Sequence, residues 1–560
     1  MKKKMQQWAA LCLALALAFC LGLPVWAEEP ETYGITSGQK GKIILDWEEG
    51  DSEENSVTAT AYRVIRVDYD YEGDVPKSPE FYWVDEVAGW VTGSYSSYIT
   101  SADKSVPETF NDDSVSAEHM KTFAGDMAQA IRGGVEITGL TAAATVTGTD
   151  PITLSNLEMG AYLILLEGGT KIYEPVFVSI VPTWDEEKDT WVLEDLEKNV
   201  TAKSQALTLT KTVYDNQGQA LAIVDYEDGG FDYAQVKIGD TVTYMLVADV
   251  PAYPADADNT SYHISDNLPE GMTLNKTSVK VYGLAENAPN IAEGDAIDES
   301  GYTLTTDSAK RPVTDTPSVT FNLDFTYNAI KNYTKIRVVY TAAANANLKT
   351  IGQDNNVNGN VNTAYLDYNN NPYGAVPTWQ TQTDTAAVYS YGIMVQKVDK
   401  SNNNPLSGAE FTLKKSDGSS EIHFVGENGV YRVATAAESG SATLAVGDSG
   451  DKMGKLVISG LDVGTYELTE TKAPDGYIKL STPVTIIITD ADSSGRVDDG
   501  SGSADGTDGY VELTVENGKG FTLPSTGGMG TMLFTAIGTV LMGGGLVLLL
   551  LYLRRRNRQE

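Results

Sequence analysis

Three polar side chains in the C-terminal third of this 560-residue chain occupy strand positions at which the alternation predicts apolar side chains. Lys397, Glu470 and Asn517 each continue a run of alternating apolar residues, and alternate residues of a strand point to the same face. The apolar residues on these three faces are Ile393 and Val395, Tyr466 and Leu468, and Val511, Leu513 and Val515. The pattern therefore predicts that an amine, a carboxyl and an amide are directed into a hydrophobic core.

Burial decides the chemistry of these groups. An isolated buried charge is very costly, so the lysine and the acid must pair, neutralise each other or react. Desolvation lowers the pKa of the lysine and raises that of the acid, which leaves a neutral amine beside a protonated carboxyl. The amine of Lys397 would then attack the side-chain carbonyl of Asn517, while Glu470 polarises the amide and shuttles protons. Ammonia leaves and an isopeptide bond remains; a buried, unreacted salt bridge is the alternative.

The residues around this set resemble a known family. The segment Leu406–Leu413 (LSGAEFTL) follows Lys397, and the segment Tyr466–Tyr477 (YELTETKAPDGY) contains Glu470. Both are similar to the collagen-adhesin B-type domain, and the second matches the E-box of that family. The resemblance implies an immunoglobulin-like β-sandwich over residues 390–520, with Lys397 joined to Asn517 and Glu470 as the promoting acid.

A second set of polar residues, Lys211, Asp266 and Asn362, shows the same alternation. It resembles the isopeptide-forming middle domain of shaft pilins, which implies a bond between Lys211 and Asn362 with Asp266 as the acid. Two alternatives stay open, because residues 262–268 also fit a plain strand end and further asparagines crowd the segment around Asn362. These asparagines are Asn355, Asn356, Asn358 and Asn360. We expect both bonds to tie a first strand to a last one.

The sequence as a whole predicts a mainly β protein. Short alternating segments rich in Val, Thr, Tyr and Ile are divided by Gly, Asn, Asp and Pro clusters, as in tandem immunoglobulin-like β-sandwiches. The length exceeds what one hydrophobic core supports. We therefore predict a first region at residues 28–199, a second at 205–385 and a third at 390–520.

The first region differs from the other two in two respects. It contains a predicted helix, Ala117–Arg132, because apolar residues recur there at helical spacing and Gly133 follows. In this region Lys42 precedes an apolar strand, but no E-box and no terminal asparagine in phase accompany it. We predict no isopeptide bond there.

The C-terminal end carries a sorting signal. Leu523, Pro524, Ser525, Thr526 and Gly527 precede an apolar run at 529–553 and an arginine-rich tail at 554–560. The run is long enough to span a bilayer, and the arginines hold its end in the cytoplasm. The LPSTG sequence resembles the LPxTG motif of Gram-positive wall proteins, which implies that a sortase thiolate attacks the bond between Thr526 and Gly527. An ordinary membrane anchor would explain the helix and the arginines, but not the pentapeptide.

Composition agrees with export. Residues 1–27 have the basic start, apolar centre and small-residue end of a signal peptide, and both cysteines lie within them, so the mature chain has no disulfide. The net charge of −37 disfavours nucleic acid as a partner. The three histidines are scattered, and the acidic stretch Asp490–Gly495 has Ser501 where an EF-hand needs glutamate. We predict no metal site and no cofactor.

A further lysine is needed if subunits are joined to one another. In sortase-assembled pilins a lysine near the end of the first domain accepts the acyl-threonine, within a motif resembling WxxxVxVYPKN. The segment Trp191–Asn199 has the Trp and the Lys-Asn pair, with shorter spacing and Glu197 in place of Pro. This resemblance points to Lys198 as the acceptor, with Lys203 and Lys188 as substitutes; all three also fit ordinary surface lysines.

Together these features resemble the major shaft pilin of a Gram-positive pilus, a structural fibre subunit secreted and anchored covalently to the cell wall. The implied partners are a sortase, identical pilin subunits and peptidoglycan, while accessory pilins and host surface ligands stay open. A rival interpretation is a wall-anchored or pilus-tip adhesin that binds host or matrix ligands through exposed loops such as Asp68–Ser78. A wall-bound enzyme is disfavoured, because no nucleophile, base and acid follow a recognisable order.

Overall fold

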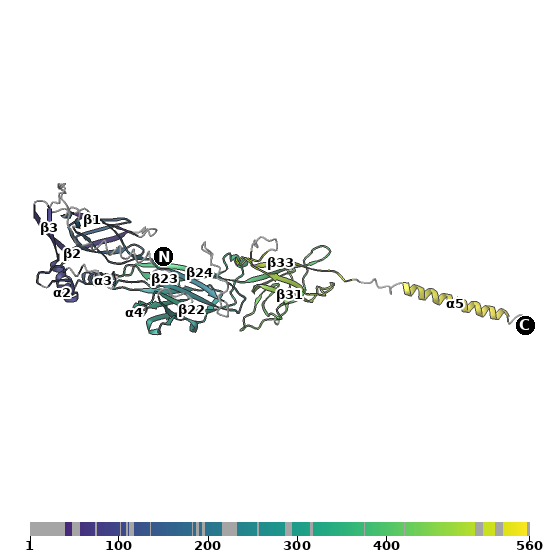
Figure 1. The fold of residues 1–560 in the computed structure, drawn as a ribbon. Helices are drawn as coiled ribbons and strands as arrows, with labels where there is room; N and C mark the ends of the chain where they lie inside the picture. The colour runs from purple at the N-terminus through teal and green to yellow at the C-terminus, as the bar shows by residue number, and fades with distance from the viewer. Residues whose placement is uncertain are drawn as a thin grey trace. The chain divides into compact units, whose positions relative to one another are not determined.

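The computed structural model describes most of the chain (Figure 1). It describes residues 40–47, 56–72, 75–100, 102–107, 110, 117–134, 136–181, 183–185, 190–192, 196–214, 232–254, 257–285, 294–313, 317–373, 376–418, 421–498, 508–520 and 530–556. The chain divides into two compact units, Met1–Ser390 and Tyr391–Glu560. The prediction of a mainly β protein is confirmed, since strands form every layer of both units except the helical one of the first region.

Two sheets build the first region. The smaller sheet has the order β11 (Glu197–Thr201), β1 (Gly41–Asp46), β5 (Ile152–Leu157). The larger has the order β3 (Val75–Trp83), β2 (Val57–Glu72), β6 (Gly160–Gly168), β8 (Val176–Ile180), with β4 (Ala144–Gly148) also on β2. Two short pairs complete the region: β9 (Thr183–Asp185) with β10 (Thr190–Val192), and β7 (Ile172–Tyr173) with β12 (Ser204–Gln205).

Two helices cover the outer face of the larger sheet, as Figure 1 shows. The predicted helix is present as α3 (Ala117–Gly133), and it buries Phe123 and Met127 completely. A second helix, α2 (Asp85–Ser94), was not expected. The expectation of an exposed loop at Asp68–Ser78 was wrong, because β2 and β3 pair as a hairpin through this segment.

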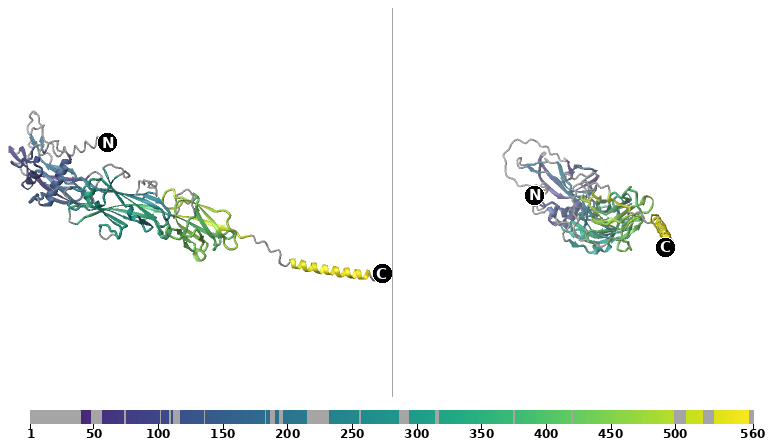
Figure 2. Two further views of the ribbon diagram at one scale, coloured as in Figure 1. Left: turned by 90° about the horizontal axis from the view of Figure 1, so that it is seen from below. Right: turned by 90° about the vertical axis from the view of Figure 1, so that its right-hand side faces the viewer.

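The second region contains two six-stranded sheets. Figure 2 shows this part of the chain in teal and green. One sheet has the order β13 (Leu209–Tyr214), β15 (Thr241–Asp249), β22 (Lys335–Ala344), β18 (Lys280–Leu284), β19 (Asp295–Ala296), with β17 (Met272–Leu274) on β22. The other has the order β14 (Asp232–Gln235), β24 (Trp379–Tyr389), β23 (Asn360–Asn369), β16 (Tyr262–Asn267), β21 (Phe321–Phe325), β20 (Tyr302–Thr305). Phe321 and Tyr340 touch edge to face between the sheets, with ring centroids 5.1 Å apart. The one-turn helix α4 (Tyr327–Ile330) links β21 to β22.

The second unit contains the third region, again two facing sheets. One has the order β27 (Phe424–Glu427), β28 (Val430–Val433), β30 (Lys455–Leu461), β25 (Tyr391–Asp399), β33 (Tyr510–Asn517). The other has the order β29 (Leu444–Ala445), β26 (Glu410–Lys415), β31 (Gly464–Lys472), β32 (Val484–Ile488). The first and last strands, β25 and β33, lie side by side and run parallel. The unit ends in the long helix α5 (Gly530–Arg556).

Candidate isopeptide sites

The third region brings Lys397, Glu470 and Asn517 together. Lys397 lies on β25 and Asn517 on the neighbouring β33, where Val515 is the register partner of Lys397. Glu470 lies on β31 of the opposite sheet. The strand alternation places all three side chains in the space between the sheets, because the apolar residue two positions before each of them is buried. These residues are Val395, Leu468 and Val515.

The contacts connect the three groups directly. The Nζ atom of Lys397 donates to the carbonyl of Val515 at 3.0 Å and lies 3.7 Å from Oε1 of Glu470. The Nδ2 atom of Asn517 donates to Oε2 of Glu470 at 3.0 Å and to the carbonyl of Ile478 at 2.6 Å. The same Oε2 accepts the Leu480 backbone N–H at 2.7 Å. The carboxyl thus contacts both the amine and the nitrogen that would leave.

Burial of this site is nearly complete. The exposed fractions of Lys397, Glu470 and Asn517 are 0%, 2% and 1%. Burial lowers the pKa of Lys397, and the nearby Glu470 opposes this effect only in part. Oε1 of Glu470 and Oδ1 of Asn517 have no hydrogen-bond partner. The acid and the amide therefore each keep one buried oxygen without a hydrogen bond, beside a lysine whose charged form is disfavoured by burial.

The second region brings Lys211, Asp266 and Asn362 together in a different arrangement. Lys211 lies on β13 of one sheet, whereas Asp266 on β16 and Asn362 on β23 lie on neighbouring strands of the other. The last strand of this region is β24, which pairs with β23. The expectation that this pair ties a first strand to a last one was therefore wrong, because Asn362 lies on the strand before the last.

A tyrosine joins the contacts of this second set. The Nζ atom of Lys211 forms an ion pair with Oδ2 of Asp266 and donates to the hydroxyl of Tyr340 at 3.1 Å. The Nδ2 atom of Asn362 donates to the same hydroxyl at 2.7 Å. The rings of Tyr244 and Tyr340 stack at 5.3 Å, and the Lys211 ammonium position lies 5.0 Å from the Tyr244 centroid. Sequence reasoning missed both tyrosines.

This second set is also sealed from water. Lys211 is 1% exposed, and Asp266 and Asn362 are both 0% exposed. Burial lowers the pKa of Lys211 and raises that of Asp266, so the proton of the pair is drawn toward the carboxyl. Oδ1 of Asp266 and Oδ1 of Asn362 have no hydrogen-bond partner. The same two features, a desolvated amine and unpaired oxygens on acid and amide, thus occur in both regions.

The other asparagines of this segment are placed elsewhere. The side chain of Asn360 is buried but donates to the backbone carbonyls of Lys349 at 2.8 Å and Val388 at 3.1 Å. Asn355 and Asn358 are exposed, and Asn356 is half-buried and donates to the carbonyl of Thr350. The structure therefore brings Asn362, and none of these four, into contact with the Lys211 cluster.

Comparison with known proteins shows which families and proteins this chain is similar to. The family described as a prealbumin-like fold domain matches residues 392–500, and the LPXTG cell wall anchor motif matches residues 515–560. The trypsin-resistant surface T6 protein of Streptococcus pyogenes serotype M6 is 25% identical over 448 residues, covering 69% of this chain and 77% of its own. This chain thus carries an LPXTG cell wall anchor and is similar to a streptococcal surface protein. The T6 backbone pilin of serotype M6 Streptococcus pyogenes, reported as a modular three-domain structure, shares its fold, with a TM-score of 0.51 at 19% identity over 87% of this chain and 100% of the other.

The first of these relatives is named as a surface protein, and this chain shares the fold of the second, a backbone pilin. The anchor motif of this chain and the apolar helix α5 place it on the cell wall. Within α5, Leu533–Arg556 is long and apolar enough to cross a membrane, with a mean hydropathy of 2.2. Residues 1–27 and the LPSTG residues 523–527 lie outside the described residues.

The lysines considered in the first region of the chain lie in different settings. Lys198 is half-buried on β11, opposite Ile43 of β1 in a parallel pair. Lys203 is exposed, and Lys188 lies outside the described residues. The Nζ atom of Lys42 forms a 2.6 Å ion pair with Glu197 at the surface, and about two fifths of its side chain is exposed (42%).

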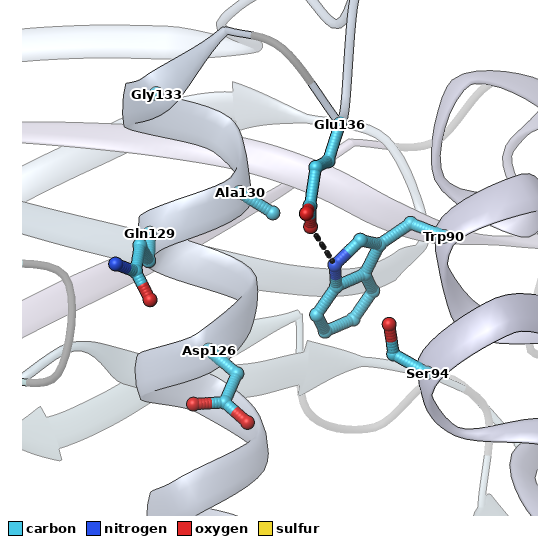
Figure 3. A pocket seen from close by; sticks show the side chains of 7 residues that line it. All are labelled: Trp90, Ser94, Asp126, Gln129, Ala130, Gly133 and Glu136. Carbon is cyan, nitrogen blue, oxygen red and sulfur yellow. Dashed lines mark hydrogen bonds between the residues drawn. The ribbon is translucent and has the colours of Figure 1, made fainter.

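A hollow of about 460 Å³ lies between α2 and α3 (Figure 3). Trp90 forms its wall, and the indole N–H donates to Oε2 of Glu136 at 3.0 Å. Asp126 accepts a hydrogen bond from the hydroxyl of Tyr95. The remaining lining residues are Ser94, Gln129, Ala130 and Gly133. Both acids thus serve the packing of the two helices.

The acidic loop of the third region is internally bonded. Asp490 accepts backbone N–H groups from Ser494 at 3.1 Å and Gly495 at 2.8 Å, and the hydroxyl of Tyr391 at 2.6 Å. Its carboxylate therefore closes the loop. Among the residues that the structure describes, no group of three or more His, Cys, Asp or Glu side chains is placed to hold a metal ion.

Proposed function

We propose that this chain is the backbone subunit of a covalently polymerised pilus, braced by two isopeptide bonds, one between Lys397 and Asn517 and one between Lys211 and Asn362. The observation that carries the proposal is the pair of buried sites, each with a desolvated lysine in contact with an acid and an asparagine placed at the same cluster. A chain with no cysteine beyond its signal peptide needs a brace of another kind.

In the third region the reaction follows from the contacts. Glu470 takes the lysine proton on Oε1, and the neutral amine attacks the side-chain carbon of Asn517. Nδ2 becomes basic once the carbon is tetrahedral, and it already bonds to Oε2, from which the carboxyl can return a proton. The carbon–nitrogen bond of the primary amide breaks, ammonia leaves, and the new amide joins the two strands. Asp266 takes the lysine proton in the corresponding reaction of Lys211 with Asn362.

Polymerisation uses a separate chemistry. A sortase would cleave between Thr526 and Gly527, and Lys198 of a neighbouring subunit would resolve the acyl-enzyme. The matches to a wall anchor and to a surface protein support this proposal. The extended parallel strand pair of β11 and β1 supplies a rigid support for Lys198.

Two measurements test the proposal. Mature protein should be lighter than its sequence by two ammonia molecules, and tryptic peptides should contain Lys397 joined to Asn517 and Lys211 joined to Asn362. In cells, Thr526→Ala should abolish the ladder of covalent polymers on a denaturing gel. Ser525→Ala, at the variable position of the motif, is the matched control and should keep the ladder. Unmodified lysine and asparagine peptides would refute the braces; a wild-type protein that runs only as a monomer would favour the adhesin alternative.

A further inference from the structure

The hydroxyl of Tyr340 lies between the two groups that are to react in the second region. It accepts a hydrogen bond from Nζ of Lys211 at 3.1 Å and another from Nδ2 of Asn362 at 2.7 Å. One oxygen atom therefore contacts both the attacking nitrogen and the leaving nitrogen. The acid Asp266 forms an ion pair with the lysine and also interacts with the Tyr340 hydroxyl and the Asn362 side chain, so the acid and the phenol both lie at the reacting groups.

The ring of Tyr340 has little freedom to move. It is 0% exposed and lies on β22, the strand between β15 and β18 in its sheet. Tyr244 stacks on one side at an interplanar angle of 24°, and Phe321 packs edge to face at 5.1 Å. Burial raises the pKa of Tyr340 well above its ordinary value, so the hydroxyl keeps its proton and remains able to donate it. The surrounding core holds the hydroxyl at the reacting atoms.

Isopeptide formation requires a proton to pass from the lysine nitrogen to the amide nitrogen. We propose that the Tyr340 hydroxyl is a catalytic proton relay for the Lys211–Asn362 bond, an inference that rests on the proposed isopeptide chemistry. Asp266 first removes one proton from the ammonium and leaves a neutral amine. When the amine attacks the Asn362 carbon, its nitrogen becomes acidic and Nδ2 becomes basic. Tyr340 accepts the proton from the lysine nitrogen and gives its own proton to Nδ2, so ammonia leaves and the phenol is regenerated.

The proposed relay by a tyrosine is specific to the second region, because the contacts in the third region differ. There Nζ of Lys397 donates to the carbonyl of Val515, and the leaving Nδ2 of Asn517 contacts the acid itself. Glu470 thus reaches both nitrogens and needs no intermediary. The two bonds of one chain therefore differ in their relay, and the Lys397–Asn517 bond is an internal control for the Lys211–Asn362 bond.

The test is the rate of bond formation in Tyr340→Phe. The full-length chain is made in a short pulse of labelled cell-free synthesis, and the joined peptides of each region are counted by mass over time. We expect the Lys211–Asn362 peptide to form about 100-fold more slowly, within the usual range for general acid–base catalysis. The Lys397–Asn517 peptide should form at its wild-type rate. Tyr262→Phe is the matched control, because Tyr262 is a buried tyrosine of the same region whose hydroxyl donates to the carbonyl of Asp249 at 3.1 Å, away from the reacting groups; the rate in this variant should not change.

The outcomes separate the two proposals. A wild-type chain without the Lys211–Asn362 peptide would refute the bond and the relay together. A bond that forms equally fast in wild type and Tyr340→Phe would refute the relay alone. Tyr340→Phe could also slow the reaction by weakening the packing of the core. This effect is measured in the Asn362→Ala background, where no bond can form. There Tyr340→Phe should leave the melting temperature unchanged, and a large fall would assign the slower reaction to lost packing and overturn the relay.

Discussion

Replacing Asn517 by Ala should remove the cross-link of the third region and expose its contribution to stability. The bond would close the chain from residue 397 to residue 517, so the unfolded state of the wild type is a large loop. The chain-entropy relation for a cross-link around a loop of this size gives about 5 kcal/mol. The two hydrogen bonds donated by the Asn517 amide add only about 1 kcal/mol each. The covalent contribution should therefore dominate.

Calorimetry of the mature protein measures this effect. For a folding unit of this size, a loss of about 5 kcal/mol corresponds to a fall in melting temperature of roughly 15–25 °C. The transition that falls in Asn517→Ala should stay in place in Asn362→Ala, which identifies it as the third region. The relay and the sortase steps do not enter this experiment.

A double-mutant cycle separates the bond from ordinary side-chain losses. Lys397→Met removes the amine while keeping an apolar stem in the core. If the bond exists, Lys397→Met and Asn517→Ala each lose it, and the double variant loses it only once, which gives a coupling of about 5 kcal/mol. Additive losses, or a shift in Asn517→Ala of no more than a few degrees, would refute the reasoning.

Three further predictions concern the other groups. Asn362→Ala should lower the transition of the second region by a similar amount, since residues 211 and 362 bound a loop of comparable length; calorimetry with Asn360→Ala as the neighbouring control checks this. Lys198→Arg should abolish the covalent ladder on denaturing gels while Lys203→Arg keeps it, and a ladder persisting in Lys198→Arg would move the acceptor elsewhere. Glu470→Ala leaves a lone buried amine whose folded pKa lies below 10.5, so the unfolded chain binds a proton that the folded chain does not. Its stability should therefore rise between about pH 8 and 10, where the amide-linked wild type has no Lys397 to titrate; equal pH profiles in denaturant titrations would contradict this.

Local periodicity predicted the parts of the sites that lie on single strands. A two-residue period assigns a face to each side chain, so the burial of Lys397, Lys211 and Asp266 could be read from their apolar neighbours. The 3.6-residue period located α3 to within one residue at its end. These predictions succeed because the side-chain direction depends on the few residues around each position.

The missed elements depend on distant contacts. Helix α2 contains Gly89, Gly93 and β-branched residues, and its N-cap Val84 makes no side-chain cap, so its local signal is weak. It forms because Val87 and Trp90 are buried in the cluster that also holds residues of α3. Propensity alone could not predict it, since tertiary packing supplies most helical stability.

Tyr340 could not be assigned to the site for a related reason. It lies 129 residues from Lys211, and the two sit on strands separated by β15. A tyrosine on an apolar strand face is usually an ordinary core residue. Only the order of strands in the sheet, which no local pattern encodes, brings its hydroxyl to the amine.

The different strand placements of the two bonds imply different mechanical behaviour. With the proposed bond in the third region, tension would enter along β25, cross from Lys397 to Asn517 and leave at the end of β33, so residues 398–516 would be excluded from the load. In the second region the load would cross from Lys211 to Asn362, and it must still pass along β24. That strand is held to β23 only by antiparallel hydrogen bonds and packing. With both proposed bonds, the second region would therefore retain one strand that force can detach, whereas the third would retain none between Lys397 and Asn517.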